Sequence, residues 1–326
     1  MLKKIAIAFV ILLASAAIIV TYVTPWPSVM VIRMVFDAGA EKAAAALASK
    51  VPTDLEVREG LTYDPADPDA RLDIYRGKGS TADGPTIVWF HGGGFVSGRR
   101  GDVANYLKIL AGQGFTVVNV DYTIAPEATY PTPIRQANTA LSYLAANATE
   151  LGINADRMVL AGDSAGAQIA AQTAAMITNA SYADAIGVKA GIGRDRLAGA
   201  LLHCGVYDVT QMGKGGGIFG WFVKSTVWAY SGERDPTGSP KFATMSVVPY
   251  LTPDFPPAFV SAGNADPLGP QSVNLAKALQ GHGVATQTLF FPADYKPPLA
   301  HEYQFDLDSE AGRLALQRST DWLRSL

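Results

Sequence analysis

Met158-Val-Leu-Ala-Gly-Asp-Ser-Ala-Gly-Ala-Gln-Ile-Ala-Ala171 is the stretch that decides the fold expected for this chain. An apolar run, a turn of very small residues and an alanine-rich run follow one another, which predicts a buried strand, a tight turn and a helix. Gly162-Asp-Ser-Ala-Gly166 matches G-x-S-x-G, the nucleophile elbow, a strained strand-to-helix turn that exposes a serine hydroxyl. Glycines flank the serine because side chains there would clash. We predict that Ser164 is a nucleophile.

The elbow pattern needs support from the rest of the chain, because a sequence with 32 glycines produces such short patterns by chance. The alternative is a strand-to-helix turn whose small residues serve packing alone. If the turn is an elbow, the next helix starts directly after the serine, with its unpaired N–H groups and positive dipole end beneath the reacting centre. Partner groups elsewhere in the sequence decide between these two interpretations.

Length and composition limit the possible classes of protein. A chain of 326 residues, 48% hydrophobic and 17% charged, is long enough for one large α/β domain with an insertion. The net charge is −3, and the only strongly one-signed local feature is a small basic N-terminus, so nucleic acid is not expected as a partner. Cys204 is the sole cysteine, which excludes an intrachain disulfide and a thiolate metal cluster.

Residues 1–27 are expected to form a separate unit. Lys3 and Lys4 precede Ile5–Thr24, which carries no charge. As a helix rising 1.5 Å per residue, this run spans about 30 Å, the thickness of the hydrocarbon core of a bilayer. We favour an uncleaved membrane anchor over a secretory signal cleaved near Ala14-Ser-Ala16, because apolar residues continue past that site. A buried core helix is the third interpretation, and the lack of a polar face argues against it.

The charges that flank this run predict an orientation. Both lysines lie on its amino-terminal side, and the first charge on the other side is Arg33. By the positive-inside rule the amino terminus stays in the cytoplasm and residues 28–326 lie beyond the membrane. If the segment is instead cleaved near Ala16, the remaining chain is secreted.

From residue 55 onward, strand and helix patterns alternate as expected for a mostly parallel sheet flanked by helices. Leu55–Arg76 is expected to form a hairpin before this alternation begins. Besides the strand and helix of the elbow, strands are expected at Thr86–Phe90, Thr116–Tyr122, Gly199–His203, Pro257–Ala262 and Thr286–Phe291, and helices at Tyr106–Gln113, Pro131–Ala146, Gln271–Leu279 and Ser309–Leu326.

Two segments do not fit this alternation. Residues 28–50 are expected to form two short helices, Ser28–Phe36 and Ala40–Lys50, separated at Gly39. Between Val206 and Pro256 the periodicity is lost, and we interpret this segment as an insertion over the site. It is rich in aromatic residues, namely Phe219, Trp221, Phe222, Trp228 and Tyr230.

His91-Gly-Gly-Gly-Phe95 directly follows the expected strand Thr86–Phe90. Three consecutive glycines allow backbone N–H groups to approach a ligand without side chains in the way. An oxyanion hole needs such groups, because a tetrahedral intermediate places negative charge on one oxygen. The alternative is a flexible glycine loop. We predict that His91 is structural and holds the loop through its ring.

An elbow serine requires an acid and then a histidine later in the chain. His301 follows the last expected strand and precedes the last helix, where this order places the base. Asp266 lies just beyond the end of a strand and is the favoured acid. The rival candidates are Asp254 and Asp294 for the acid, and His91, His203 and His282 for the base. Any one of these residues alone has a surface role as its alternative, whereas the set in this order predicts a catalytic site.

The combined motifs resemble the hormone-sensitive-lipase-like branch of the α/β-hydrolases, which includes bacterial esterases and the arylacetamide deacetylases. The residues that carry the resemblance are His91–Phe95, Gly162–Gly166, Asp266-Pro-Leu268 and His301. The resemblance covers about residues 55–326. Asp121–Glu127 is similar to a further loop of that family.

The resemblance implies an α/β-hydrolase fold with a helical cap built from about residues 28–52 and 207–250. It implies a catalytic triad of Ser164, Asp266 and His301. It also implies oxyanion N–H donors at Gly93, Gly94 and Ala165, although which two of Gly92–Gly94 donate stays open.

The chain departs from the family pattern in three places. Thr123 stands where an arginine is usual, Gly269-Pro270 replaces a polar pair after Asp266-Pro-Leu268, and Glu302-Tyr303 follows His301 where a glycine is usual. These departures leave the triad chemistry in place and leave open the shape of the surrounding loops.

The resemblance implies a carboxylic ester hydrolase that acts on small apolar acyl esters, without a metal or an organic cofactor. One alternative is an amidase, peptidase or deacetylase with the same triad. Another is a membrane-tethered ligand-binding protein on an inactive scaffold, as in the related plant gibberellin receptors. Those receptors lack a functional histidine, whereas His301 is present here. The sequence gives no oligomeric state.

Overall fold

Among residues 2–78, 80, 83–212 and 216–326, which the computed structural model describes, eight strands form one sheet in the order β1-β2-β4-β3-β5-β6-β7-β8. Their bounds are β1 Glu56–Thr62, β2 Arg71–Arg76, β3 Thr86–Phe90, β4 Thr116–Val120, β5 Met158–Asp163, β6 Leu197–His203, β7 Ala258–Ala262 and β8 Thr286–Phe290. β2 runs antiparallel to β1 and β4, and all other neighbours are parallel. The expected hairpin and the mostly parallel sheet are confirmed.

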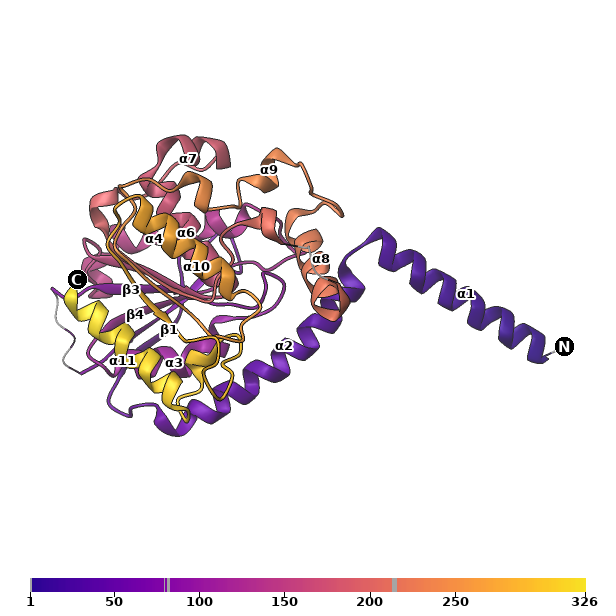
Figure 1. Cartoon of the computed structure of the whole chain (residues 1–326), viewed down its shortest axis with the longest axis horizontal. Helices are drawn as coiled ribbons and strands as arrows, with labels where there is room; N and C mark the ends of the chain where they lie inside the picture. The colour runs from indigo at the N-terminus through magenta and orange to yellow at the C-terminus, as the bar shows by residue number, and fades with distance from the viewer. Residues whose placement is uncertain (1, 79, 81–82, 213–215) are drawn as a thin grey trace.

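Helices cover both faces of this sheet (Figure 1). Their bounds are α1 Leu2–Val23, α2 Trp26–Leu47, α3 Arg100–Ala111, α4 Thr132–Ala146, α5 Ala148–Leu151, α6 Ala165–Thr178, α7 Ala180–Ile186, α8 Gly217–Ser231, α9 Pro240–Ala243, α10 Gly269–Gly281 and α11 Glu310–Ser325. Val88 and Phe90 of β3 belong to the core with α4, α6 and α10, while Ile87 and Trp89 belong to the core with α3 and α11. A strand buried on both faces is expected to be continuously apolar, as β3 is.

Several boundaries differ from the expectation. α3 begins at Arg100, six residues before the expected Tyr106, because its first turn is polar and gives little apolar signal. α5, α7 and α9 were not expected; they are short, with few apolar turns to reveal them. The expectation of two helices separated at Gly39 was wrong, since α2 runs unbroken from Trp26 to Leu47. A single glycine costs a helix only about 1 kcal/mol, and packing against α3 and α8 outweighs that cost.

The N-terminal helix α1 projects away from the body of the molecule (Figure 1). In the part of the chain that the structure describes, it is the one helix long and apolar enough to cross a membrane, judged by length and composition. Only Thr24 and Pro25 separate it from α2. Residue 1 of the expected N-terminal unit and residues 213–215 of the expected insertion lie outside the described residues. Within the insertion, α8 packs against α2 near the point where α1 leaves the body (Figure 1).

Candidate active site

Ser164 occupies the sharp turn between β5 and α6. Its φ and ψ are 52° and −117°, a conformation that a residue with a side chain rarely adopts. A Cβ on Gly162 would lie 2.5 Å from the backbone of Gly166, and a Cβ on Gly166 would lie 2.0 Å from the carbonyl oxygen of Phe90. The two glycines are therefore required by close backbone approach, as expected for an elbow.

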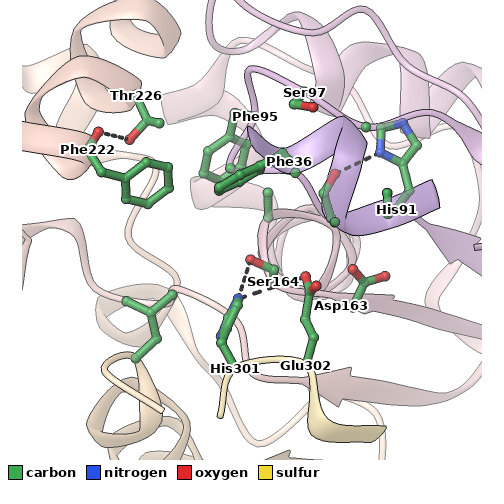
Figure 2. Close-up of a pocket in the computed structure, with 18 of the residues that line it drawn as sticks. Phe36, His91, Phe95, Ser97, Asp163, Ser164, Phe222, Thr226, His301 and Glu302 are labelled. Atoms are coloured by element: carbon green, nitrogen blue, oxygen red, sulfur yellow. Dashed lines mark hydrogen bonds and ion pairs between the residues drawn. The ribbon is translucent and has the colours of Figure 1, made fainter. Parts of the chain in front are cut away.

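His301 and Asp266 meet Ser164 at the carboxyl edge of the sheet. The Oγ of Ser164 lies 2.9 Å from Nε2 of His301 (Figure 2). Nδ1 of the same ring lies 3.0 Å from Oδ2 of Asp266. The second carboxylate oxygen of Asp266 accepts a hydrogen bond from the N–H of Leu268 at 2.8 Å. The structure thus brings together the three residues that the sequence order had selected.

Asn264, which sequence reasoning did not single out, joins the loop of Asp266 to the loop of His301. Its side-chain oxygen accepts from the N–H of Leu299 at 2.8 Å, and its side-chain nitrogen donates to the carbonyl of Tyr295 at 3.1 Å. The N–H of Ala265 donates to the carbonyl of Leu299 at 2.9 Å. These bonds fix the acid and the histidine relative to one another. The only signal in the sequence was an amide residue two positions after the end of a strand.

Among the described residues, the side chains of the rival acids and bases make no hydrogen bond to the Ser164 hydroxyl. Asp254 pairs with Arg194 at the surface, and Asp294 is exposed. His282 is an exposed residue at the end of α10. His203 is fully buried in β6 and contacts the Oγ of Ser261 at 2.6 Å, and burial lowers its pKa to about 3. His203 is therefore neutral at physiological pH.

The ring of His301 has an anion on one side and the serine hydroxyl on the other. Burial disfavours the imidazolium, but the Cys204 sulfur and the Asp266 carboxylate beside the ring outweigh burial and raise the pKa of His301. Burial also raises the pKa of the Cys204 thiol, so the hydrogen bond between Nδ1 of His301 and Asp266 is the contact that fixes the ring. A histidine held in this way accepts a proton readily, and the carboxylate orients the ring and stabilises the imidazolium that forms.

The glycine loop after β3 presents free N–H groups to the same place. Gly93 and Gly94 have φ of 107° and 61°, and a Cβ on Gly93 would lie 2.1 Å from the carbonyl oxygen of Ser97. The N–H groups of Gly93 and Gly94 have no acceptor among the residues that the structure describes. Ala165 is the first residue of α6, so its N–H also lies outside the helical hydrogen-bond pattern.

His91 holds this loop from below. Its Nδ1–H lies 2.8 Å from the carbonyl oxygen of Gly92, and its ring stacks on Tyr122 with 4.3 Å between centroids. The Tyr122 hydroxyl donates to the carbonyl of His91 at 2.8 Å. Burial lowers the pKa of His91, so the ring is neutral. These contacts agree with the structural role that we predict for His91.

α2 is clamped to the other side of the loop by Arg33. Its guanidinium donates to the carbonyl of Val96 at 2.6 Å, to the carbonyl of Ala125 at 3.0 Å, and to both carboxylate oxygens of Glu127 at 2.8 and 2.6 Å. Asp37, one turn further along α2, accepts a hydrogen bond from the Ser97 hydroxyl at 2.9 Å. Sequence reasoning missed these contacts, and a lone arginine in an apolar helical run was the available signal.

Two carboxyl groups lie side by side beneath the glycine loop. Asp163, directly before the serine, is buried and accepts from the indole N–H of Trp89 at 2.9 Å. Glu302, in the left-handed conformation with φ of 61°, turns its carboxyl toward Asp163 (Figure 2). Burial first, and then the charge of Glu302, raises the pKa of Asp163 well above its usual range. The buried position of Asp163 therefore favours the protonated form of its carboxyl group.

A cavity of about 450 Å³ opens above Ser164 and His301. Its walls are mostly apolar and include Val35 and Phe36 of α2 and Phe219 and Phe222 of α8. Figure 2 shows Phe36 and Phe222 above the serine. The rings of Phe36 and Phe222 lie 5.4 Å apart and join the two helices. A volume of this size suits a small organic ligand.

A serine–histidine–carboxylate chain at the carboxyl edge of a mostly parallel sheet, next to free backbone N–H groups, defines a serine hydrolase architecture. Residues 87–295 match the model of the family described as alpha/beta hydrolase fold. The chain belongs to this family. The fold and the resemblance predicted from the sequence motifs are thereby confirmed.

Several known proteins similar to this chain are esterases. An acetyl esterase from Salmonella paratyphi B is 28% identical over 215 residues, which make up 64% of this chain and 63% of that protein. The chain thus spans less than two thirds of the length of this relative. Esterase B from Lactobacillus rhamnosis is 25% identical in sequence, with a TM-score of 0.75 over 91% of this chain and 95% of that chain. The Pyrobaculum calidifontis esterase has a TM-score of 0.73 at 23% identity over 91% and 92% of the two chains, and supports the fold alone.

Proposed function

We propose that the protein is a carboxylic ester hydrolase in which Ser164, His301 and Asp266 form the catalytic triad. The observation that carries this proposal is the continuous chain of contacts from the Ser164 hydroxyl through both nitrogens of His301 to Asp266, at 2.9 and 3.0 Å. The esterases among the relatives and the solved structures support the same reaction class.

The reaction proceeds through a covalent acyl-enzyme. Nε2 of His301 takes the proton of Ser164 as its oxygen attacks the ester carbonyl, and Asp266 stabilises the imidazolium that forms. His301 then gives the proton to the leaving alcohol. A water molecule attacks the acyl-enzyme with His301 again as the base, and the acid is released when the serine regains its proton.

The negative charge of the tetrahedral intermediate rests on backbone N–H groups. We assign these donors to Gly93, Gly94 and Ala165, because they border the cavity and have no protein acceptor among the described residues. Each such donor contributes about 10²–10³-fold to the rate of acyl transfer in comparable sites.

The substrate class that we propose is esters with small apolar acyl groups. The largely apolar lining and the volume of about 450 Å³ support this class, and the cavity offers few charged groups to a polar substrate. We also propose that residues 28–52 and 207–250 serve as the cap, which the packing of α2 against α8 supports. Residues 1–27 are proposed to anchor the chain in a membrane, with secretion after cleavage as the alternative.

The decisive experiment is Ser164→Ala in the full chain, purified in detergent and assayed on p-nitrophenyl esters of graded chain length and on a p-nitroanilide. Ester hydrolysis should fall by about 10⁴-fold or more. Ser272→Ala is a matched control, because Ser272 is also buried and its hydroxyl has no partner among the described residues. This control should keep full activity.

The same screen separates the alternatives. Near-normal ester hydrolysis by a folded Ser164→Ala protein contradicts the assigned nucleophile. Faster cleavage of the anilide than of every ester by the unaltered chain favours an amidase or peptidase. If no substrate is cleaved while apolar esters raise the melting temperature, the protein is a ligand-binding protein on this scaffold.

A further inference from the structure

Exposed apolar side chains gather on one side of the molecule, on the outward sides of α2 and α8. Apart from α1, the exposed large hydrophobic residues in the described part of the chain all lie on these two helices, with the exceptions of Val57 and Leu314. We call the following set the outer face: Met30, Met34, Val35, Ile218, Phe219 and Trp221. Scattered apolar residues are normal on a protein surface, but a contiguous set on two packed helices marks an interaction site.

The first half of α2 is apolar on both of its sides. Val29 and Ile32 are buried in the core, whereas Met34 is 73% exposed on the outward side. Met30 and Met34 are one helical turn apart, so they form a stripe along the helix. Ile218, at the start of α8, is 85% exposed. A helix that is hydrophobic all around is normally covered on every side, by protein or by lipid.

The position of α1 indicates what covers the outer face. α1 has 22 residues, which at 1.5 Å per residue is about 33 Å, and only two residues separate it from Trp26 at the start of α2. If α1 spans a bilayer, α2 begins at the surface of that bilayer. Trp26 and Trp221 are both exposed, and tryptophan is enriched at the depth of the lipid head groups.

The outer face is continuous with the cavity above Ser164. Val35 and Phe219 are 64% and 41% exposed, and both also line the cavity. Their neighbours Met34 and Ile218 point outward and do not line it. The cavity therefore opens within the apolar surface itself.

We propose that the outer face rests in the head-group region of a lipid bilayer and that the ester substrate enters the cavity from the bilayer. This proposal rests on the proposed membrane anchor and deepens the proposed function, because it names the substrate class as apolar esters dissolved in lipid. The free energy that favours this location comes from removing exposed apolar side chains from water, at about 25 cal/mol per Å² of apolar surface. A substrate that moves from lipid to an apolar cavity also avoids crossing water.

Spin labels test the location of the outer face without relying on activity. Cys204 is the sole cysteine and is buried, so labels introduced by Met34→Cys or Ile218→Cys report on single positions. The full chain is reconstituted in vesicles of phosphatidylcholine and phosphatidylglycerol. Labels at Val57→Cys and Leu314→Cys are matched controls, because both residues are exposed and apolar but lie on β1 and α11.

The measurement is the accessibility of each label to oxygen, which dissolves in lipid, relative to a nickel chelate, which stays in water. We expect the ratio at Met34→Cys and Ile218→Cys to exceed that of both controls several-fold. Equal ratios at all four positions overturn the proposal. Magnetic coupling between labels at the same position of two molecules also overturns it, because a second copy then covers the outer face.

A second experiment tests substrate entry. The double variant Met34→Asp/Ile218→Asp should hydrolyse water-soluble p-nitrophenyl acetate at the normal rate, because neither residue lines the cavity. Hydrolysis of a long-chain alcohol acetate dissolved in vesicles should fall about tenfold or more. Val57→Asp/Leu314→Asp is the control and should affect neither substrate. Equal effects on both substrates overturn entry from the bilayer. If the unaltered chain cleaves neither ester, the proposed ester hydrolysis is wrong, and the spin labels still decide the location of the outer face.

Discussion

Arg33→Ala should destabilise the fold and slow turnover together, because Arg33 connects α2 to the glycine loop. In the native structure its guanidinium donates hydrogen bonds to the carbonyls of Val96 and Ala125 and to the carboxylate of Glu127. Alanine leaves both carbonyls without this donor. Because the N–H of Val96 donates to the carbonyl of Gly93 at 3.2 Å, loosening at Val96 reaches the proposed oxyanion hole directly.

The magnitude follows from the contacts. A hydrogen bond from a charged donor contributes about 1.5 kcal/mol or slightly more, so the two carbonyl contacts together contribute about 3 kcal/mol. The pair with Glu127 adds less than about 1 kcal/mol, because the Glu127 side chain is 42% exposed and solvent screens the charges. We expect the free energy of unfolding to fall by about 3–4 kcal/mol. Lys50→Ala, which removes a pair with the well-exposed Asp308, should cost less than about 1 kcal/mol.

Urea unfolding of the full chain in detergent, monitored by circular dichroism, measures the change in the free energy of unfolding. Steady-state kinetics on a soluble ester measures the second effect, and kcat should fall more than KM rises, because the oxyanion contact strengthens only as charge develops. If Arg33→Ala unfolds at the same urea concentration as Lys50→Ala and keeps its kcat, the clamp contributes neither stability nor order to the loop.

Three further predictions address the site. Gly93→Ala should lower kcat about 10²–10³-fold for each donor lost, because a Cβ would meet the carbonyl of a neighbouring turn at 2.1 Å, and a loss in KM alone would place the oxyanion hole elsewhere. Asp266→Asn should reduce kcat severely, because it removes the carboxylate that accepts the hydrogen bond from His301, whereas Asp254→Asn should change kcat little. Reversed effects in the same kinetic assay would show that Asp254 is the catalytic acid. Asp163 has a raised pKa in the folded state, so the folded chain binds more protons and the free energy of unfolding falls as pH rises from about 4 toward that pKa. Asp163→Asn should weaken this fall in urea unfolding measured between pH 4 and 8, and an unchanged pH dependence would show that Asp163 is charged in the native protein.

The sequence was sufficient to predict the elements whose signals are local or ordered along the chain. Ser164 lies in a five-residue pattern that only a tight turn with close backbone approach requires. Asp266 and His301 follow successive strands, and in a parallel sheet the carboxyl ends of strands share one edge. For these residues, order along the chain was enough to predict proximity in space.

The remaining features depend on contacts between distant segments. Arg33 reaches a carbonyl 63 residues away, and no periodicity reveals such a bond. The carboxyl of Glu302 turns toward Asp163 because the backbone at Glu302 adopts the left-handed conformation, which the sequence indicated only as a departure from glycine. The unbroken course of α2 likewise depends on packing against α3 and α8, which a propensity argument at Gly39 did not include.

Gly39 has a further consequence, since it lines the cavity and a Cβ placed there would meet no atom within 4 Å. The missing side chain lowers helix stability by about 1 kcal/mol relative to alanine and leaves part of the cavity unfilled. Under the proposed ester hydrolysis, the stability of α2 and the size of the largest acyl group that fits are therefore coupled through Gly39. Side chains of increasing size at Gly39 would shorten the cavity in graded steps. In engineered variants, the residue at this position would then set the longest acyl chain that the cavity accepts.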